Sequence, residues 1–226
     1  MWREQAVPRL LARQEDSIIR SVRIKTIGIG ESAAEQELGS LVESDNPVIA
    51  TYAKNDGVHI HVTARAGTES EAIALLESGC NAVYERLSQF IYGENETGLD
   101  EAILNAARTH GVRIAIIDAG GGRFDSLLAA QPDAWDVVTE AIFIPPDDRS
   151  AIDLARSGVT ASDVLGVGIL VRYDRGEHGH ATGTIDVATA GPVELLQSLP
   201  FRGPLAELQR RSGLAAADIT LKALRQ

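Results

Sequence analysis

The sequence predicts an α/β protein in which a small α+β domain is followed by a three-layer α/β/α domain with a mixed sheet. Up to residue 94 the periodic segments run strand, helix, hairpin, helix, an order typical of a compact α+β unit. From residue 95 onward strands alternate with helices and then form a hairpin, which indicates a mixed sheet with helices on both faces. The chain has 226 residues, 44% of them hydrophobic, and is long enough for two modest cores.

The first domain follows a predicted linker helix over residues 1–20, whose apolar stripe is interrupted by Pro8. Residues 22–26 then alternate apolar and polar side chains in the manner of a half-buried strand. Asn55-Asp56-Gly57 joins two further apolar runs, and because Asn and Gly tolerate positive φ, an antiparallel hairpin is expected there. The expected elements are a strand at 22–26, a helix at 31–43, strands at 47–54 and 58–66, and a helix at 68–89.

The polar stretch 93–98 is flanked by glycine and has no apolar periodicity, so it marks the predicted boundary between domains at 21–94 and 95–226. The helical stripe beyond it stops at Gly111, and the apolar run that follows is typical of a strand buried on both faces. The expected elements are helices at 99–110, 124–130 and 148–157, strands at 112–119, 137–144, 164–173 and 182–190, an edge strand at 193–199, and a helix ending near residue 225.

Composition excludes several classes of function. The formal net charge is -11 and no local basic stripe stands out, so nucleic-acid binding is not expected. The single cysteine, Cys80, cannot form an intramolecular disulfide, and its place on an apolar helical stripe predicts a core residue. No apolar run approaches the roughly 20 residues of a spanning helix. The N-terminus lacks the apolar centre of a secretory signal, so a cytoplasmic location without a membrane partner is expected.

Four short motifs carry a family resemblance: Met1-Trp2 with Val7-Pro8-Arg9-Leu10, Thr26-Ile27-Gly28-Ile29-Gly30-Glu31-Ser32, Tyr52-Ala53-Lys54 and Ile91-Tyr92-Gly93-Glu94. Together they resemble the linker and KH-like middle domain of CinA proteins, the competence/damage-inducible family. The resemblance implies a KH-like α+β fold for 21–94, a nicotinamide-nucleotide amidase-like fold for 95–226, and a homo-oligomer. The family's molybdopterin-binding-like domain precedes the first motif and is absent, so a fragment or a naturally shortened relative is expected.

The resemblance also implies a serine nucleophile, in a Glu-Ser-Cys-Thr-Gly-Gly turn after the first strand of the amidase domain. Here that turn is Asp118-Ala119-Gly120-Gly121-Gly122-Arg123, and alanine has no atom that can attack a carbonyl. The family's Tyr-Ser-Asn-Glu-Ala-Lys stretch corresponds to Ile144-Pro145-Pro146-Asp147-Asp148-Arg149, whose arginine is too basic to accept a proton. Its later Gly-rich segment is replaced by residues 170–175. We therefore expect a non-catalytic chain used for oligomerisation, scaffolding or ligand binding.

Two other functions stay open. Glycines between a buried strand and a helix expose backbone N–H groups, so the turn at 118–123 either binds a nucleotide or other anion or is a flexible remnant. The enzymatic alternative is a nicotinamide mononucleotide amidase that releases ammonia, with Ser126 or Thr139 as a relocated nucleophile.

No cofactor and no metal are predicted. Carboxylates at 118, 147 and 148 follow neighbouring strands and suit Mg²⁺, but helix capping by Asp147 or Asp148 explains two of them. The pairs His59/His61 and His178/His180 lack a third ligand, and the solvent face of a strand and a polar loop explain them. Gly28-Ile29-Gly30 lacks the Gly-x-x-Gly spacing with which KH domains clamp RNA.

Overall fold

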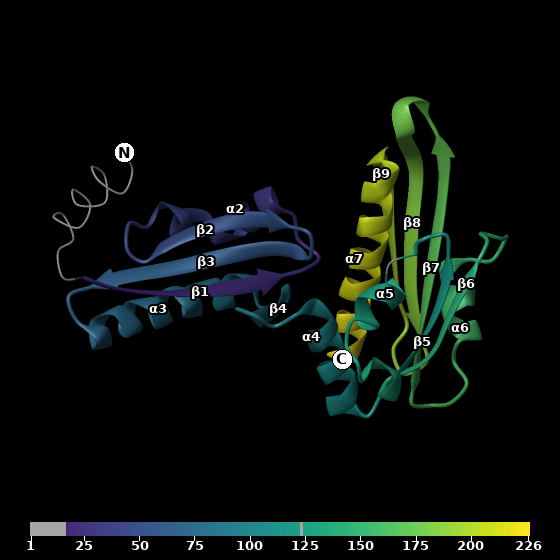
Figure 1. Ribbon diagram of the computed structural model, residues 1–226, viewed down its shortest axis with the longest axis horizontal. Coiled ribbons are helices and arrows are strands. Elements are labelled where there is room, and N and C mark those ends of the chain that lie inside the picture. Colours follow the sequence, from purple (N-terminus) through teal and green to yellow (C-terminus); the bar gives the residue numbers. More distant parts are fainter. Residues whose placement is uncertain (1–16, 123) are drawn as a thin grey trace. The chain divides into compact units, whose positions relative to one another are not determined.

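The computed structural model describes residues 17–122 and 124–226, which form two compact units (Figure 1). The first unit ends at Asn95 and the second comprises Glu96–Gln226. Each has a sheet of its own, four-stranded in the first and five-stranded in the second. The predicted fold class is therefore confirmed, while residues 1–16 of the predicted linker helix lie outside the described part of the chain.

The first unit is an antiparallel sheet in the order β2-β3-β1-β4 with helices on one face. The hairpin prediction is confirmed, because β2 pairs with β3 directly across the turn at 55–57. The elements are β1 (Ile18–Thr26), α2 (Glu31–Leu38), the 3₁₀ helix η2 (Gly39–Glu43), β2 (Val48–Lys54), β3 (Gly57–Ala66), α3 (Glu69–Leu87) and β4 (Ile91–Glu94).

The core of the first unit lies between the sheet and helices α2 and α3. Ile24, Ile60 and Val62 project from β1 and β3 onto Leu38 of α2 and Leu87 of α3, and all five are fully buried. The long helix begins at the cap residue Thr68, as its sequence pattern predicts. Cys80 packs against this core half-buried, and burial raises the pKa of its thiol to about 11.

Two predictions for this unit are wrong, and one strand was not predicted. Ile18 and Ile19 are not helical but begin β1, where they pair with Ala66 and Arg65 of β3. The helix over 31–43 is interrupted at Gly39, whose φ of 55° ends α2. The strand β4 was not predicted from the sequence. Its four residues adjoin a polar stretch, and β1, the strand with which they pair, is far away in the sequence.

The second unit is a mixed sheet in the order β6-β5-β7-β8-β9, parallel for the first three strands and antiparallel for the rest. The predicted mixed sheet is confirmed. The elements are α4 (Leu99–His110), β5 (Arg113–Ala119), α5 (Phe124–Leu128), η3 (Ala134–Asp136), β6 (Val138–Ile144), α6 (Ala151–Ser157), β7 (Val164–Arg175), η4 (Glu177–Gly179), β8 (His180–Ala190), β9 (Leu195–Pro204) and α7 (Leu205–Leu224).

Helices cover both faces of this sheet, as predicted. The short helix α6 packs on β5, β7 and β8 on one face of the sheet. Helix α7 packs on β7, β8 and β9 on the other face, and α4 and α5 pack against α7 (Figure 1). One detail differs. Helix α6 is capped by Ser150, which exchanges hydrogen bonds with Asp153, so capping by Asp147 or Asp148 is wrong. Within the described residues, no helix is long and apolar enough to cross a membrane.

Candidate functional site

The candidate site is the turn after β5, at the edge where the parallel strands β5, β6 and β7 run out. Ala119 is the last residue of β5, and it lies beside Ile144 of β6 on one side and Leu170 of β7 on the other. The register therefore brings together the positions that sequence reasoning assigned to a nucleophile and to a tyrosine. Both positions hold apolar side chains.

The methyl group of Ala119 lies inside a hydrophobic core. Ala119 is 0% exposed and belongs to the cluster between the sheet and α6, together with Ala151, Leu154 and Leu170, while Ile144 packs against the cluster from β6. The residues beside Ala119 on the two flanking strands, Ile144 and Leu170, are both hydrophobic and supply neither a reactive heteroatom nor a base. Ala119 has no exposed surface, so a substrate carbonyl cannot contact its methyl group unless the surrounding side chains move.

Asp118 faces the opposite side of the sheet and folds back onto its own turn. Its carboxylate accepts hydrogen bonds from the backbone N–H of Gly121 and of Gly122, each 2.6 Å long. The side chain is buried, and this burial raises the pKa of Asp118 against the opposing effect of the two N–H donors, with the charge of Asp125 adding to the rise. The N–H groups that an incoming anion would use are thus already bound by the protein's own carboxylate.

The glycines of the turn are required by close packing. Gly120 and Gly122 have φ of 95° and 68°, conformations that other residues adopt with difficulty. A Cβ on Gly122 would lie 2.8 Å from the ring of Phe143, and one on Gly121 would lie 2.8 Å from Ile169. Backbone conformation and packing explain these glycines without a ligand. Arg123, the last residue of the predicted ligand loop, lies outside the described residues.

Arg149, which stands where a lysine base is expected, is held by Asp147 in the loop before α6. Its Nε and Nη2 lie 2.9 and 2.7 Å from Asp147 Oδ2, and that hydrogen bond lowers the pKa of the Asp147 carboxyl. Arg172 of β7 donates to the carbonyl oxygens of Asp147 and Arg149, each at 3.0 Å. Because the guanidinium stays protonated and paired, it cannot act as a base.

Neither relocated nucleophile is well placed. Ser126 lies on α5 with its side chain exposed, and no histidine lies on α5 or in the turn that precedes it. Thr139 lies near the start of β6 and donates a hydrogen bond to the carbonyl of Ile114 at 3.3 Å. Ile114 is five residues before Ala119, which at about 3.3 Å per residue places Thr139 about 16 Å from the candidate turn.

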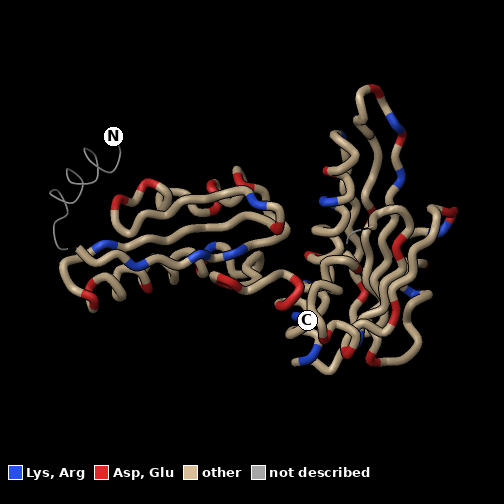
Figure 2. Tube along the Cα trace, viewed as in Figure 1, with Lys and Arg blue, Asp and Glu red and all other residues tan. Residues whose placement is uncertain are grey.

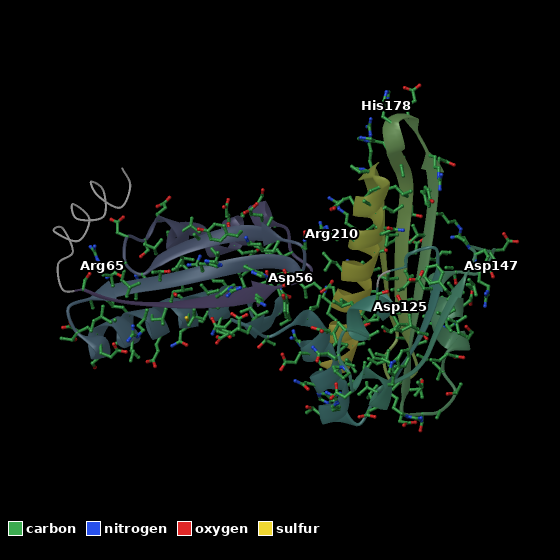
Figure 3. All side chains as sticks on the ribbon, viewed as in Figure 1. Asp56, Arg65, Asp125, Asp147, His178 and Arg210 are labelled. Carbon is green, nitrogen blue, oxygen red and sulfur yellow. The ribbon has the colours of Figure 1, made fainter. Side chains whose placement is uncertain are left out.

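The acidic residues of this edge do not converge on a metal site. Asp118 is turned into its own loop and Asp147 is paired with Arg149, while Figure 3 shows Asp125 and Asp147 well apart in the second unit. His178 lies at the exposed tip of the β7–β8 hairpin (Figure 3). Over residues 17–122 and 124–226, no group of three or more His, Cys, Asp or Glu side chains is arranged to hold a metal ion.

Comparison with known proteins points to one family. Residues 21–93 match the damage-inducible protein CinA KH domain. A CinA-like protein from Thermomicrobium roseum is 38% identical over 235 residues, covering 99% of this chain and 58% of that protein. The chain belongs to the CinA family. A CinA-like protein from Deinococcus radiodurans is 29% identical with the same coverage, so the chain spans somewhat over half the length of these CinA relatives.

One solved structure, a competence or damage-inducible protein from Enterobacter asburiae, matches 57% of this chain and 99% of its own with 12% identity. The TM-score of this match is 0.40. Within this CinA chain, the segment 170–175, which replaces the expected Gly-rich segment, continues β7 as a strand paired with β8. It forms no loop at the candidate site.

One face of the sheet in the CinA KH unit gathers basic and histidine side chains from neighbouring strands. Arg23 lies opposite His61, and Lys25 lies opposite His59, on the face of the sheet that points away from α2 and α3, where Lys25 and His59 are both buried. Lys54 of β2 lies next to Tyr52, whose ring is tilted against that of His61 with the ring centroids 4.6 Å apart, and Figure 2 shows the lysine and arginine positions of β1 in blue. Alternation along paired strands gathers on this face residues that are scattered in sequence. The absence of nucleic-acid binding stays a prediction.

His59 is buried, which corrects its assignment to a solvent-facing strand surface. Its Nε2 lies 2.9 Å from Asp56 Oδ1, although the ring N–H is not aligned for a hydrogen bond. Burial lowers the pKa of His59, and the attraction of Asp56 only partly offsets this. Burial acts on Asp56 in the opposite direction, but the Tyr92 hydroxyl, which donates to Asp56 at 2.7 Å, and His59 together leave the pKa of that carboxyl lowered.

Acidification should therefore weaken the CinA KH unit. A histidine with a lowered pKa in the folded state makes the folded state less stable as the pH falls below the histidine's unfolded pKa of about 6.5. The reason is that the unfolded chain then binds more protons than the folded chain. The free energy of unfolding, measured by urea titration, should fall between neutral pH and about pH 5, and His59→Gln should reduce that fall. The exposed His178→Gln is the control. An equal pH dependence of wild type and His59→Gln would contradict the assignment.

Proposed function

We propose that this CinA-family chain is non-catalytic and that its second unit serves self-association and scaffolding. The observation that carries the proposal is the burial of Ala119 in an apolar cluster with Ile144 as its neighbour across the strand pair. Acyl transfer needs a nucleophile, a base beside it and donors for the developing oxyanion. The first two positions are apolar or paired, and Asp118 occupies the backbone donors of the turn.

Binding of a nucleotide or another anion in the turn is less well supported. An anion would have to displace the Asp118 carboxylate from the N–H groups of Gly121 and Gly122 and would meet its negative charge at short range. Self-association requires no such rearrangement. We therefore expect the chain not to bind nicotinamide mononucleotide at the turn.

The test follows ammonia release from nicotinamide mononucleotide together with a calorimetric titration of the same ligand. We expect neither ammonia nor saturable heat. Saturable heat without ammonia would replace the scaffold by a ligand-binding role. Ammonia release would overturn the proposal, and the variants Ser126→Ala and Thr139→Ala would then show which hydroxyl reacts.

Restoring the serine should not restore an enzyme. In Ala119→Ser the hydroxyl would be buried between Ile144 and Leu170, neither of which can accept its proton, so we expect no ammonia release and a loss of about 1–3 kcal/mol in the free energy of unfolding. The control is Ser126→Ala, which removes a hydroxyl group at an exposed position. Its free energy of unfolding should stay within about 0.5 kcal/mol of wild type. Turnover by Ala119→Ser would show that the site is intact apart from one atom.

A further inference from the structure

The sheet of the first unit has an open face, by which we mean the face that points away from α2 and α3. Three large hydrophobic side chains are exposed on it: Ile19 of β1 at 57%, Val48 of β2 at 48% and Tyr52 of β2 at 43%. Strand alternation places them there, because Ile24 and Ile49 on the same two strands point into the core on the other face. Exposed hydrophobic side chains gathered on one face indicate a surface that another segment covers.

A hollow of about 350 Å³ lies on the open face, at the end of the sheet where β1 begins. Its lining combines apolar, polar and charged side chains: Ile19, Asp45, Asn46, Val48, Thr63 and Arg65. Arg65 of β3 lies opposite Ile19, and Figure 3 shows it at this end of the sheet. Over residues 17–122 and 124–226, no ion pair involves the Arg65 guanidinium. The hollow therefore offers apolar surface beside a cation.

Residues 1–16, which lead directly into β1, lie outside the described part of the chain, but their sequence suits this face. Apolar residues recur in it at the three- and four-residue spacing of one side of a helix: Val7, Leu10 and Leu11. Sixteen residues in helical conformation span about 24 Å, and the nine residues of β1 span about 30 Å. The segment is therefore long enough to lie along the open face.

Charge and connectivity favour the same occupant. Asp16 comes three residues before Ile19, and Glu15 comes one residue earlier, so both carboxylates stay close to Arg65 across the strand pair. An ion pair there would contribute little by itself, but it favours one placement of the segment over others. Because the segment is joined to β1, its effective concentration at the open face is on the order of millimolar. A separate molecule would have to compete with that.

We propose that residues 1–16 fold back onto the open face of their own chain, with their apolar side against Ile19 and Val48 and their acidic end beside Arg65. The sheet of the first unit is then covered on both faces, and the segment is a layer of this unit rather than a free linker. This inference goes beyond the function proposed for the second unit. Its failure would leave that proposal unchanged.

The test is a double-mutant cycle in the full chain, followed by urea unfolding of the first unit. Leu10→Ala and Val48→Ala remove the two sides of one proposed contact. The unfolding constant of the double variant should therefore differ at least about twofold from the value expected for independent changes. Ile73→Ala on α3, at a residue 40% exposed, is the matched control, and its effect should add to that of Leu10→Ala. Additive effects in both pairs would overturn the proposal.

Tryptophan emission gives a readout that does not depend on stability. The chain has two tryptophans, so Leu10→Trp combined with Trp2→Phe and Trp135→Phe leaves one probe, placed in the proposed contact. Its emission should lie to the blue of the urea-unfolded chain. Adding Val48→Lys should shift the emission to the red while circular dichroism stays unchanged, and adding Ile73→Lys should not. Emission like that of the unfolded chain, or a blue shift that appears only at raised protein concentration, contradicts docking within one chain.

Discussion

Replacing Gly168 by alanine is expected to lower the free energy of unfolding of the second unit by about 3 kcal/mol or more. Gly168 lies on β7, where a Cβ would come within 2.0 Å of the carbonyl oxygen of Ala151 and 2.5 Å of the backbone nitrogen of Ala155. Both atoms belong to the backbone of α6, which cannot rotate out of the way as a side chain can. Strand β7 is paired on both sides, so it cannot shift either. The helix must move off the sheet.

The measurement is urea unfolding followed by circular dichroism, with Gly176→Ala as the control in the same unit. The nearest atom to a Cβ at Gly176 is 3.7 Å away, an ordinary contact, so this variant should stay within about 0.5 kcal/mol of wild type. Because α6 covers Ala119, a displaced helix would also open the apolar cluster at the candidate site. Equal stability of Gly168→Ala and Gly176→Ala would show that the approach of α6 to β7 is not this close.

Replacing Asp118 by alanine is expected to lower the free energy of unfolding by about 3 kcal/mol, because the backbone N–H groups of Gly121 and Gly122 would lose the carboxylate that accepts from both of them. The loss should be partly offset, since a buried carboxylate that has a raised pKa is itself unfavourable when charged. Asp148→Ala, an exposed carboxylate at the same edge, is the control and should change stability by less than about 0.5 kcal/mol.

The pH dependence gives a second readout of the same variant. A carboxyl whose folded pKa is raised contributes stability that is present at low pH and is lost as pH rises through the folded pKa. The deficit of Asp118→Ala relative to wild type in urea unfolding should therefore be larger in mild acid than at neutral pH. A deficit that grows with rising pH would mean that the carboxylate is stabilised in its charged form, contrary to its burial.

Elements set by local chemistry were predictable. The turn at 55–57 specifies the hairpin, the apolar stripe of α3 specifies its helix, and Gly111 in the left-handed conformation ends α4 where the pattern stops. Elements set by remote partners were not. Ile18 and Ile19 continue an apolar pattern that suits a helix, but they form part of β1 because they pair with β3. The strand β4 exists only because β1 offers its free edge.

For the candidate site, the sequence alone showed that the serine, tyrosine and lysine expected from the resemblance to CinA proteins are missing. Nucleophilic catalysis depends on which atoms are present, and the sequence lists them. Only the tertiary structure decided what replaces them. Strand register sets Ala119 against Ile144 inside a core, the fold of the turn directs Asp118 onto its own N–H groups, and the strand order leaves β6 at an edge. These outcomes depend on contacts between segments far apart in sequence, which neither periodicity nor a motif encodes.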